Sequence, residues 1–363
     1  MIKYYTRACN FIYGNLAKKK IKSRQALPLC WNKLIAFSSV EIFIRNKNKV
    51  ITKVINIQKI DSLNPKLKIK IKKDIKIITS KRKSFLKNIN FSKTSIMGIL
   101  NLTPDSFSDG GKYSSKAKAY KRIAQMIKQG AKIIDVGGES TRPGSKTINA
   151  EREWGRIKET IQNFKKNYKF ALLSVDTRKS TVIQKSIEAG ADIINDVSGF
   201  NFDKDSLKII LKNNIPKVIH HMQGTPNTMQ NKPKYNNVLL DIYDFFEKTI
   251  TNTDKRKIII DPGIGFGKNL KHNLTLISKI SLFHSLGFPI LVGTSRKRFI
   301  SQISGLNDSK ERIGGTVASI LYLLTQVLQI FRVHDVNEIK QSILVFEKIL
   351  MNKWKINILV QME

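Results

Sequence analysis

Short apolar segments alternate with longer amphipathic ones through residues 95–351, and this rhythm limits the possible fold more than any other feature of the sequence. The apolar segments have the length of buried strands, and the segments between them have helical spacing. We predict strands at 95–100, 132–136, 171–175, 192–196, 217–221, 257–261, 289–293 and 330–334. We predict helices at 115–129, 150–165, 178–189, 204–213, 238–252, 272–285, 310–327 and 336–351.

Strict alternation of strands and helices indicates a parallel sheet, because parallel neighbours need a crossover connection between them. Eight such units within residues 87–363 match the usual size of a (β/α)8 barrel. We therefore predict an α/β protein whose main domain, residues 87–363, is a TIM barrel. An open doubly wound sheet is the alternative.

Residues 1–86 do not follow this rhythm and are strongly basic. The stretch 67–78, LKIKIKKDIKII, alternates as a strand would, but nearly all its polar positions are Lys. Three interpretations stay open: a targeting segment, a solvated basic arm, and translated upstream sequence with little structure. We favour an extension of low order. The chain is expected in the cytoplasm, with organellar import through residues 1–86 left open.

The charge balance is unusual, with 65 Lys and Arg against 27 Asp and Glu and a net charge of +38. The excess is spread along the chain, mostly as Lys beside abundant Ile and Asn, as an AT-rich genome would produce. No nucleic-acid-binding motif accompanies it, so we expect no nucleic-acid partner. No apolar run reaches membrane-spanning length, so we expect no membrane partner. Cys9 and Cys30 both precede the barrel, which therefore needs no disulfide.

Polar side chains stand at the carboxyl ends of several predicted strands, which is the catalytic face of a barrel. Asp176, Asn195 and Asp261 offer hydrogen-bond acceptors and donors suited to a flat heterocycle with ring nitrogens and an amine. Lys297 follows the seventh strand and could offset repulsion between the two carboxylates. Any one Asp at such a position could instead cap the next helix.

A second set of polar residues suits phosphate and a metal ion. Arg332 and His334 end the eighth strand, where barrels commonly hold phosphate, although His334 could also be an ordinary strand histidine. Asn101 could give one oxygen to Mg²⁺, which takes its other ligands from water and a diphosphate. Lys268 ends a GFGK fragment, but the full phosphate-loop pattern is missing, so a nucleoside triphosphate is not expected.

Two long motifs, MGILNLTPDSFSDGG (97–111) and DVGGESTRPGS (135–145), resemble the signature loops of the dihydropteroate synthase family. SVDT, IINDVSG, HMQGTPNTMQ, DPGIGFGKNLKHN, GTSRKRF and RVHDV are similar to the remaining blocks of that family, in the same order. The resemblance covers about residues 85–353 and is greatest to the bacterial single-function enzymes. It implies an enzyme of folate biosynthesis, a transferase that joins a dihydropterin-methyl diphosphate to 4-aminobenzoate and releases diphosphate.

The resemblance also implies roles for individual residues. The pterin diphosphate would be bound by Thr141, Asp176, Asn195, Asp261, Lys297, Arg332 and His334. The aminobenzoate would be bound by Phe107, Arg142, Pro143 and Ser295, and Mg²⁺ by Asn101. The expected catalytic residues are Asp261, Lys297, Arg332 and His334. The family further implies a homodimer and competition by sulfonamides.

One position departs from the family pattern. A Gly usually turns the last barrel helix into the eighth strand, and Val327 stands near that position here. A β-branched residue resists positive φ, so we expect this helix to end differently.

The alternative function is that of another pterin-binding barrel, such as a methyltetrahydrofolate-dependent methyltransferase. That class would not need the grip on diphosphate that Arg332 and His334 provide.

Overall fold

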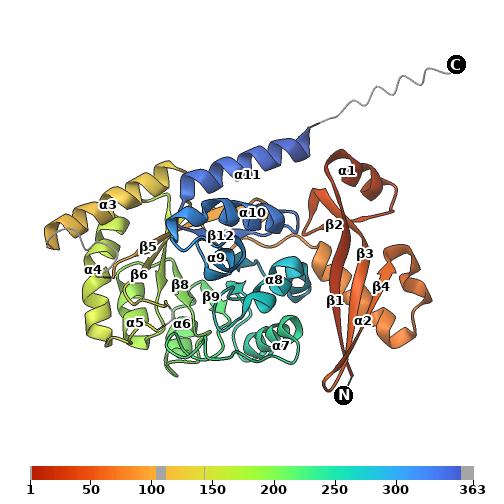
Figure 1. The fold of residues 1–363 in the computed structure, drawn as a ribbon, viewed down its shortest axis with the longest axis horizontal. Coiled ribbons are helices and arrows are strands. Elements are labelled where there is room, and N and C mark those ends of the chain that lie inside the picture. The colour runs from red at the N-terminus through yellow and green to blue at the C-terminus, as the bar shows by residue number, and fades with distance from the viewer. Residues whose placement is uncertain (1, 104–111, 143, 353–363) are drawn as a thin grey trace.

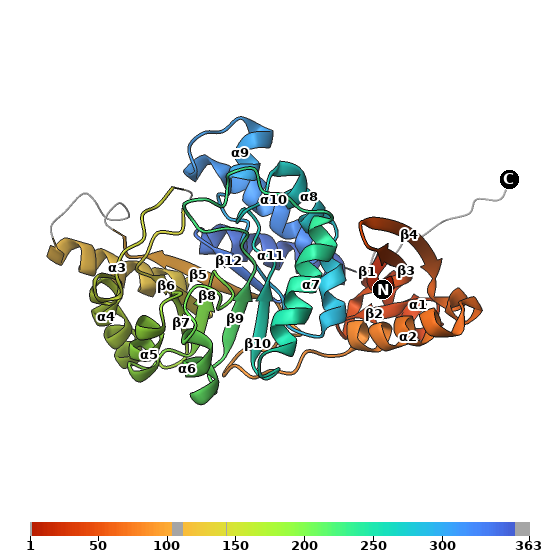
Figure 2. The same cartoon turned by 90° about the horizontal axis from the view of Figure 1, so that it is seen from below.

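The computed structural model describes residues 2–103, 112–142 and 144–352. They form two domains that lie side by side, an N-terminal domain drawn in red and orange and a barrel drawn from yellow to blue (Figure 1). Residues 80–94 join the two domains and run beneath the barrel (Figure 2).

The larger domain is a barrel of eight parallel strands. Its strands follow one another around the barrel in chain order, from β5 to β12. A bridge between Ile260 of β10 and Ile290, the residue before β11, joins the two ends of the hydrogen-bonded order and closes the sheet. The strands are β5 (Ser95–Asn101), β6 (Ile133–Gly137), β7 (Leu172–Asp176), β8 (Ile193–Asp196), β9 (Lys217–His220), β10 (Ile258–Asp261), β11 (Leu291–Val292) and β12 (Ile330–Val333).

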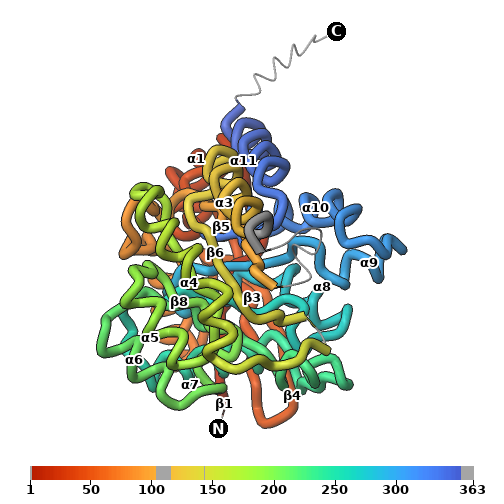
Figure 3. The backbone as a smooth tube through the Cα atoms, turned by 90° about the vertical axis from the view of Figure 1, so that its left-hand side faces the viewer, coloured from red at the N-terminus to blue at the C-terminus, as the bar shows by residue number. Residues whose placement is uncertain are grey.

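Helices cover the outside of the sheet, so the predicted (β/α)8 barrel is confirmed. The helices are α3 (Lys112–Lys128), α4 (Ala150–Asn167), α5 (Ser180–Glu188), α6 (Ser206–Lys212), α7 (Val238–Thr251), α8 (Leu270–Ser278), α9 (Arg298–Ser304), α10 (Ile313–Leu324) and α11 (Val336–Met351). The 3-10 turns η3 (Ile280–Leu286) and η4 (Lys310–Arg312) extend two of the predicted helices, and α9 was not predicted. Helices α3 and α4 lie on the side of the barrel away from the N-terminal domain (Figure 3).

The expectation of low order for residues 1–86 is wrong. A four-stranded antiparallel sheet forms around the long strand β3, which pairs with the other three strands. The elements are β1 (Ile2–Tyr13), α1 (Gly14–Lys22), β2 (Leu27–Leu29), β3 (Asn32–Asn46), β4 (Lys49–Asn56), η1 (Ile57–Ser62) and α2 (Pro65–Thr79). Its own apolar core, which includes Leu29, Phe37 and Ile71, lies between this sheet and α2.

The segment that alternates as a strand is the helix α2. Leu67, Ile71 and Ile78 are spaced for one helical face and are buried, whereas Ile69 is 69% exposed. The start of the helix is fixed by Asn64, whose side chain accepts a hydrogen bond from the N–H of Leu67, and by a proline at the first helical position. These start signals decide between two periodicities that the apolar residues fit equally well.

The two domains share their apolar cores. Tyr5 and Phe43 of the N-terminal sheet belong to the cluster between the barrel and its helices. Val327, which precedes β12, belongs instead to the core of the N-terminal domain. Polar contacts also cross the boundary: Cys30 Sγ lies 3.2 Å from Nδ1 of His284. The N-terminal domain, which lies beside the barrel (Figure 2), is therefore packed against it through both apolar and polar contacts.

Val327 adopts the left-handed conformation that a β-branched residue disfavours, with φ of 58°. The expectation that helix α10 would end differently is therefore wrong. The side chain of Val327 is 9% exposed and packs in the N-terminal core, which a glycine could not do. Contact between the domains thus accounts for a side chain at this position.

Among the described residues, no helix is both long enough and apolar enough to cross a membrane.

Candidate active site

The inside of the barrel is filled from below by an apolar layer. Each strand contributes one inward side chain to it: Met97, Ile133, Leu172, Ile193, Val218, Ile259, Leu291 and Ile330. Leu86, Ile89 and Phe91 of the connecting segment pack against the same layer. The barrel is therefore a closed core at its amino-terminal end, and only its carboxyl end can hold a ligand.

The next inward position on each strand lies two residues further along, because side chains alternate between the two faces of a sheet. That layer consists of Ile99, Asp135, Ser174, Asn195, His220, Asp261, Gly293 and Arg332. Two residues further again, at the rim, lie Asn101, Gly137, Asp176, Ser295 and His334. A polar mouth thus stands directly above an apolar floor.

Arg332 ties together three strands at this mouth. Its Nε donates to Oδ2 of Asp135 at 2.6 Å, and its Nη2 donates to Oδ2 of Asp176 at 2.7 Å. Nδ2 of Asn195 donates to the same oxygen of Asp135 at 3.1 Å. Burial raises the pKa of the Asp176 carboxyl in spite of the nearby guanidinium. Arg332 therefore favours the ionised form of the Asp176 carboxyl.

Lys297 and Asp261 form the opposite wall. Burial lowers the pKa of Lys297 to about 8, although Asp261 and Asp176 act against that shift. Burial raises the pKa of Asp261 to about 6, with Lys297 as the main opposing charge. The Lys297 ammonium donates to the backbone oxygen of Ile264 and lies 4.4 Å from the centre of the Phe266 ring. The cation is thereby held over the mouth rather than in solvent.

His334 has a fixed ring orientation. Its backbone N–H donates to Oγ of Ser295 at 3.2 Å, and its Nδ1 lies 3.0 Å from the same oxygen. With the Ser295 hydroxyl as the donor to Nδ1, the hydrogen of the neutral ring lies on Nε2. Burial lowers the pKa of His334 to about 3, with Arg296 and Arg332 adding to the shift. At neutral pH the His334 ring is therefore uncharged.

The loop after β6 is fastened by buried charges. Glu139 accepts from Nε of Arg178 at 2.9 Å and pairs with Nζ of Lys179 at 2.9 Å. Burial would raise the pKa of Glu139, but these two cations hold it below the usual value. Thr141 and Arg142 follow directly in the same loop, and the Arg142 charge acts on the His334 ring. The loop is thus anchored at Glu139, and the residues that follow Glu139 extend towards the mouth.

Most of the predicted site residues meet at this one end of the barrel. They are Asn101, Asp176, Asn195, Asp261, Ser295, Lys297, Arg332 and His334. Thr141 and Arg142 lie on the loop beside it, and Phe107 and Pro143 fall outside the described residues. Geometry places these side chains together, and their individual roles stay predictions.

Asp135 and His220 are titratable residues of the mouth that were missing from the prediction. Asp135 is fully buried and joins Arg332 to Asn195, and His220 Nε2 lies 3.9 Å from Oδ2 of Asp261. Burial lowers the pKa of His220 far below its usual range, so this ring is neutral. Counting in steps of two from the apolar layer would have found both residues.

The residues present fit the expected Mg²⁺ only as a partial ligand set. No cluster of three or more His, Cys, Asp or Glu suited to a metal occurs within the described ranges. Oδ1 of Asn101 lies at the rim, 3.7 Å from the place where a Cβ on Gly137 would stand. One amide oxygen at the rim suits an ion whose other ligands are water and diphosphate oxygens.

Comparison with known proteins places this geometry in a family. The family model described as "Pterin binding enzyme" matches residues 97–334. Dihydropteroate synthase of Escherichia coli K12 is 40% identical over 271 residues, which are 73% of this chain and 95% of that protein. The chain belongs to the dihydropteroate synthase family. The enzyme of that name from Synechocystis is 39% identical over 69% of this chain and 88% of its own length.

Solved structures of the dihydropteroate synthase family agree with this assignment. The Yersinia pestis enzyme, crystallised with a sulfonamide drug complex, has a TM-score of 0.68 at 38% identity and covers 72% of this chain and 96% of that one. The Xanthomonas albilineans enzyme with 4-aminobenzoic acid has a TM-score of 0.68 at 33% identity and covers 73% and 96%. The family model begins at residue 97, after the N-terminal domain.

Proposed function

We propose that this chain is a dihydropteroate synthase that joins (7,8-dihydropterin-6-yl)methyl diphosphate to 4-aminobenzoate, giving 7,8-dihydropteroate and diphosphate. The family assignment supports the reaction class as a transferase of folate synthesis. The mouth of the barrel supports the substrate pair, because it combines a polar recess above an apolar floor with cationic groups at the rim.

The observation that carries the proposal is a set of buried polar atoms without a protein partner. Oδ1 of Asp135, Oδ1 of Asn195 and Oγ of Ser174 make no hydrogen bond to any described residue. Buried acceptors of this kind are costly unless a ligand satisfies them. The ring N–H and exocyclic amine of a pterin are donors that would do so, with Asp176, Asp261 and Lys297 around them.

The bond that breaks joins the pterin methylene to a diphosphate oxygen, and its electron pair leaves with the diphosphate. Nε2–H of His334 and the guanidinium of Arg332 would donate to that departing group. Nη1 of Arg332 has no partner among the described residues and would make this contact. Asn101 would hold Mg²⁺, and the ion when bound supplies further positive charge at the diphosphate.

The new bond forms between the methylene carbon and the amine nitrogen of 4-aminobenzoate, which then loses a proton to water. An aromatic amine is uncharged at neutral pH, so no strong base is required. The carboxylates of Asp176 and Asp261 would offset positive charge on the pterin during this step. Arg142 and Ser295, together with Phe107 and Pro143, would surround the aminobenzoate.

Product formation from the two substrates tests this function directly. The full chain is expected to form dihydropteroate with Mg²⁺ present and to lose most of that activity with a chelator. Product formed when one substrate is left out would contradict the proposal. So would the absence of product when both substrates are present. A sulfonamide is expected to compete with 4-aminobenzoate.

We also propose a homodimer. Helices α10 and α11 carry exposed apolar side chains, Tyr322, Leu344, Val345 and Ile349, each at least 46% exposed. Exposed apolar side chains of this kind support a protein contact. Sedimentation is expected to give a dimer, and Val345→Glu with Ile349→Glu is expected to give a monomer. That no nucleic acid binds, and that the chain is cytoplasmic, also stay predictions.

A further inference from the structure

We propose that Arg45, in the N-terminal domain, is a positioning residue for the catalytic mouth. It would act through Asp241 on the loop between β9 and α7, residues 221–237, and through that loop on the segment that holds Lys297. This inference rests on the proposed function and adds a role for a domain that lies before the family match.

The first link is an ion pair across the domain boundary. Arg45 stands at the end of β3, and its Nη1 lies 2.7 Å from Oδ1 of Asp241 in the first turn of α7. The side chains are 15% and 23% exposed, so the pair is largely shielded from solvent. Beside it, Oδ1 of Asn48 in the β3–β4 turn accepts from Nδ2 of Asn236 at 3.3 Å. The hairpin thus contacts both α7 and the loop before it.

The second link lies within Asp241. Its other oxygen, Oδ2, accepts from the backbone N–H groups of Asn236 at 2.9 Å and Asn237 at 3.1 Å. One carboxylate therefore holds Arg45 on one side and the end of the 221–237 loop on the other. Movement of Arg45 would release or rotate this carboxylate and with it the end of the loop.

The third link connects the loop to the mouth. Tyr235 donates to the backbone oxygen of Gly267 at 2.8 Å, and Gln230 donates to that of Gly265 at 2.8 Å. The Lys297 ammonium donates to the neighbouring Ile264 oxygen, and a Cβ on Gly265 would stand 3.0 Å from Cδ of Lys297. The position of the 263–267 segment therefore sets the position of Lys297.

The same loop reaches the segment that carries Thr141 and Arg142. The backbone oxygen of Pro226 accepts from the N–H of Gly144 at 3.2 Å. Both walls of the mouth, the one with Lys297 and the one with Arg142, are thus in contact with the 221–237 loop.

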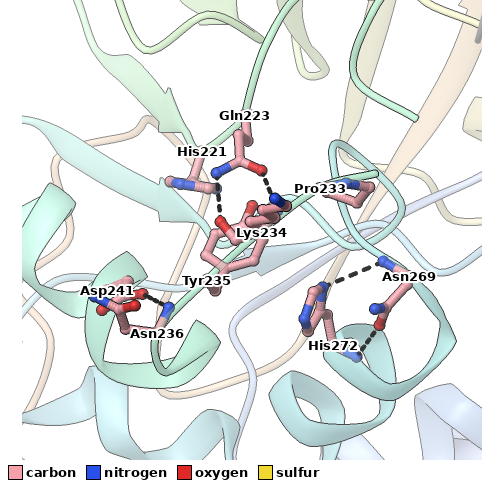
Figure 4. A pocket seen from close by; sticks show the side chains of 9 residues that line it. All are labelled: His221, Gln223, Pro233, Lys234, Tyr235, Asn236, Asp241, Asn269 and His272. Carbon is pink, nitrogen blue, oxygen red and sulfur yellow. Dashed lines mark hydrogen bonds between the residues drawn. The ribbon is translucent and has the colours of Figure 1, made fainter. Parts of the chain in front are cut away.

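The 221–237 loop borders a hollow and is therefore not packed on every side. A hollow of about 640 Å³ lies between the loop and the beginnings of α7 and α8. Its lining residues include His221, Gln223, Tyr235, Asn236, Asp241 and His272, which Figure 4 shows around the open space. The packing of Tyr235 and the buried Met229 holds part of the loop, and discrete hydrogen bonds hold the rest, so loss of one anchor is expected to move it.

The test compares Arg45→Ala with Lys3→Ala in the full-length enzyme. Lys3 also joins the N-terminal domain to α7, through Asp244 and Glu247, but makes no hydrogen bond or ion pair to a described residue of the 221–237 loop. Arg45→Ala is expected to raise KM for the pterin diphosphate about five-fold while kcat changes less than about two-fold. Lys3→Ala is expected to leave this KM unchanged. Arg45→Lys is expected to give a KM close to that of the wild type.

Docking of the domain is followed separately by the reactivity of Cys9 and Cys30, which are both buried. Arg45→Ala with unreactive thiols and a raised KM supports the proposal. An unchanged KM overturns it, as does an equal rise in Lys3→Ala, because general loosening of the interface would then explain the effect. Failure of the proposed function is distinguishable, since the wild-type enzyme itself would then form no product.

Discussion

Arg332 donates from Nη2 to Oδ2 of Asp176 at 2.7 Å across the mouth of the barrel. The sequence assigns these two residues to different ends of the substrate, the diphosphate and the pterin. The ion pair joins the two ends before any ligand binds. Substitution of either residue should therefore affect the binding of both the pterin and the diphosphate.

Arg332→Ala is expected to reduce turnover by about 100-fold or more, since a donor to the departing charge is lost. It should also weaken binding of a pterin that lacks the diphosphate, by about ten-fold, because Asp135 and Asp176 are left as unpaired buried carboxyls. Kinetics and calorimetry on the same protein measure the two effects. Asp176→Asn should weaken pterin binding less in the Arg332→Ala variant than in the wild type. Full additivity, or unchanged pterin binding, would show that the pair does not couple the two ends.

Pterin affinity should depend on pH through Lys297. Burial lowers the pKa of Lys297 to about 8, so its proton is lost in a range where an exposed lysine stays charged. Binding that needs the ammonium should be complete below about pH 7 and should weaken as pH rises through 8. Calorimetric titration between pH 6.5 and 9.5 measures this. A constant affinity over that range would mean that Lys297 is not a charged contact.

Lys297→Met is the matched variant for that titration. It should abolish pterin binding while the protein stays folded. The folded pKa of Lys297 lies below its unfolded value, so the unfolded state holds the proton more tightly and the wild type is destabilised at pH 7. The variant should therefore have the higher Tm at pH 7, and the difference should shrink as pH rises from 8 towards 10.5. A lower Tm at pH 7 would contradict this sign.

Ser295→Ala should lower kcat about five-fold, because the hydroxyl that fixes the His334 ring is lost while the ring itself stays. The family resemblance implies that Ser295 lies in the aminobenzoate pocket, whereas its hydroxyl lies 3.0 Å from Nδ1 and 3.2 Å from the backbone N of His334. KM for 4-aminobenzoate separates the two roles. A rise in that KM with unchanged kcat would favour the pocket role, and Ser342→Ala on α11 serves as an inert control.

The barrel was predictable because its signals are local and repeated. Apolar strands of one length recur with helices between them, and the residues at strand ends follow from the period of two. The same count applied from Ile133 and Val218 would have reached Asp135 and His220, which were missed because each was read singly rather than as part of a layer.

The N-terminal domain was not predictable in the same way. Its basic composition suggested an arm, yet β1 and β3 pair along most of their lengths and bury Ala8 and Val40. The sheet is held by pairing between residues far apart in sequence, which no local pattern reveals. In α2, the Asn64 and Pro65 start signals were present and outweigh the alternating pattern.

Substitutions of Val327 can separate its backbone strain from the packing of its side chain between the domains. Its φ of 58° is unfavourable for a β-branched residue by about 1–2 kcal/mol, and burial of its side chain in the N-terminal core offsets a similar amount. Val327→Ala should keep much of the strain and lose most of the packing, so it should be the least stable. Val327→Gly should lose the packing but relieve the strain, and should lie about 1 kcal/mol above the alanine variant. Denaturant unfolding of the three full-length proteins measures the order. An alanine variant as stable as the glycine one would show that residue 327 is not strained, and one as stable as the wild type would show that its side chain contributes nothing to the docking of the N-terminal domain.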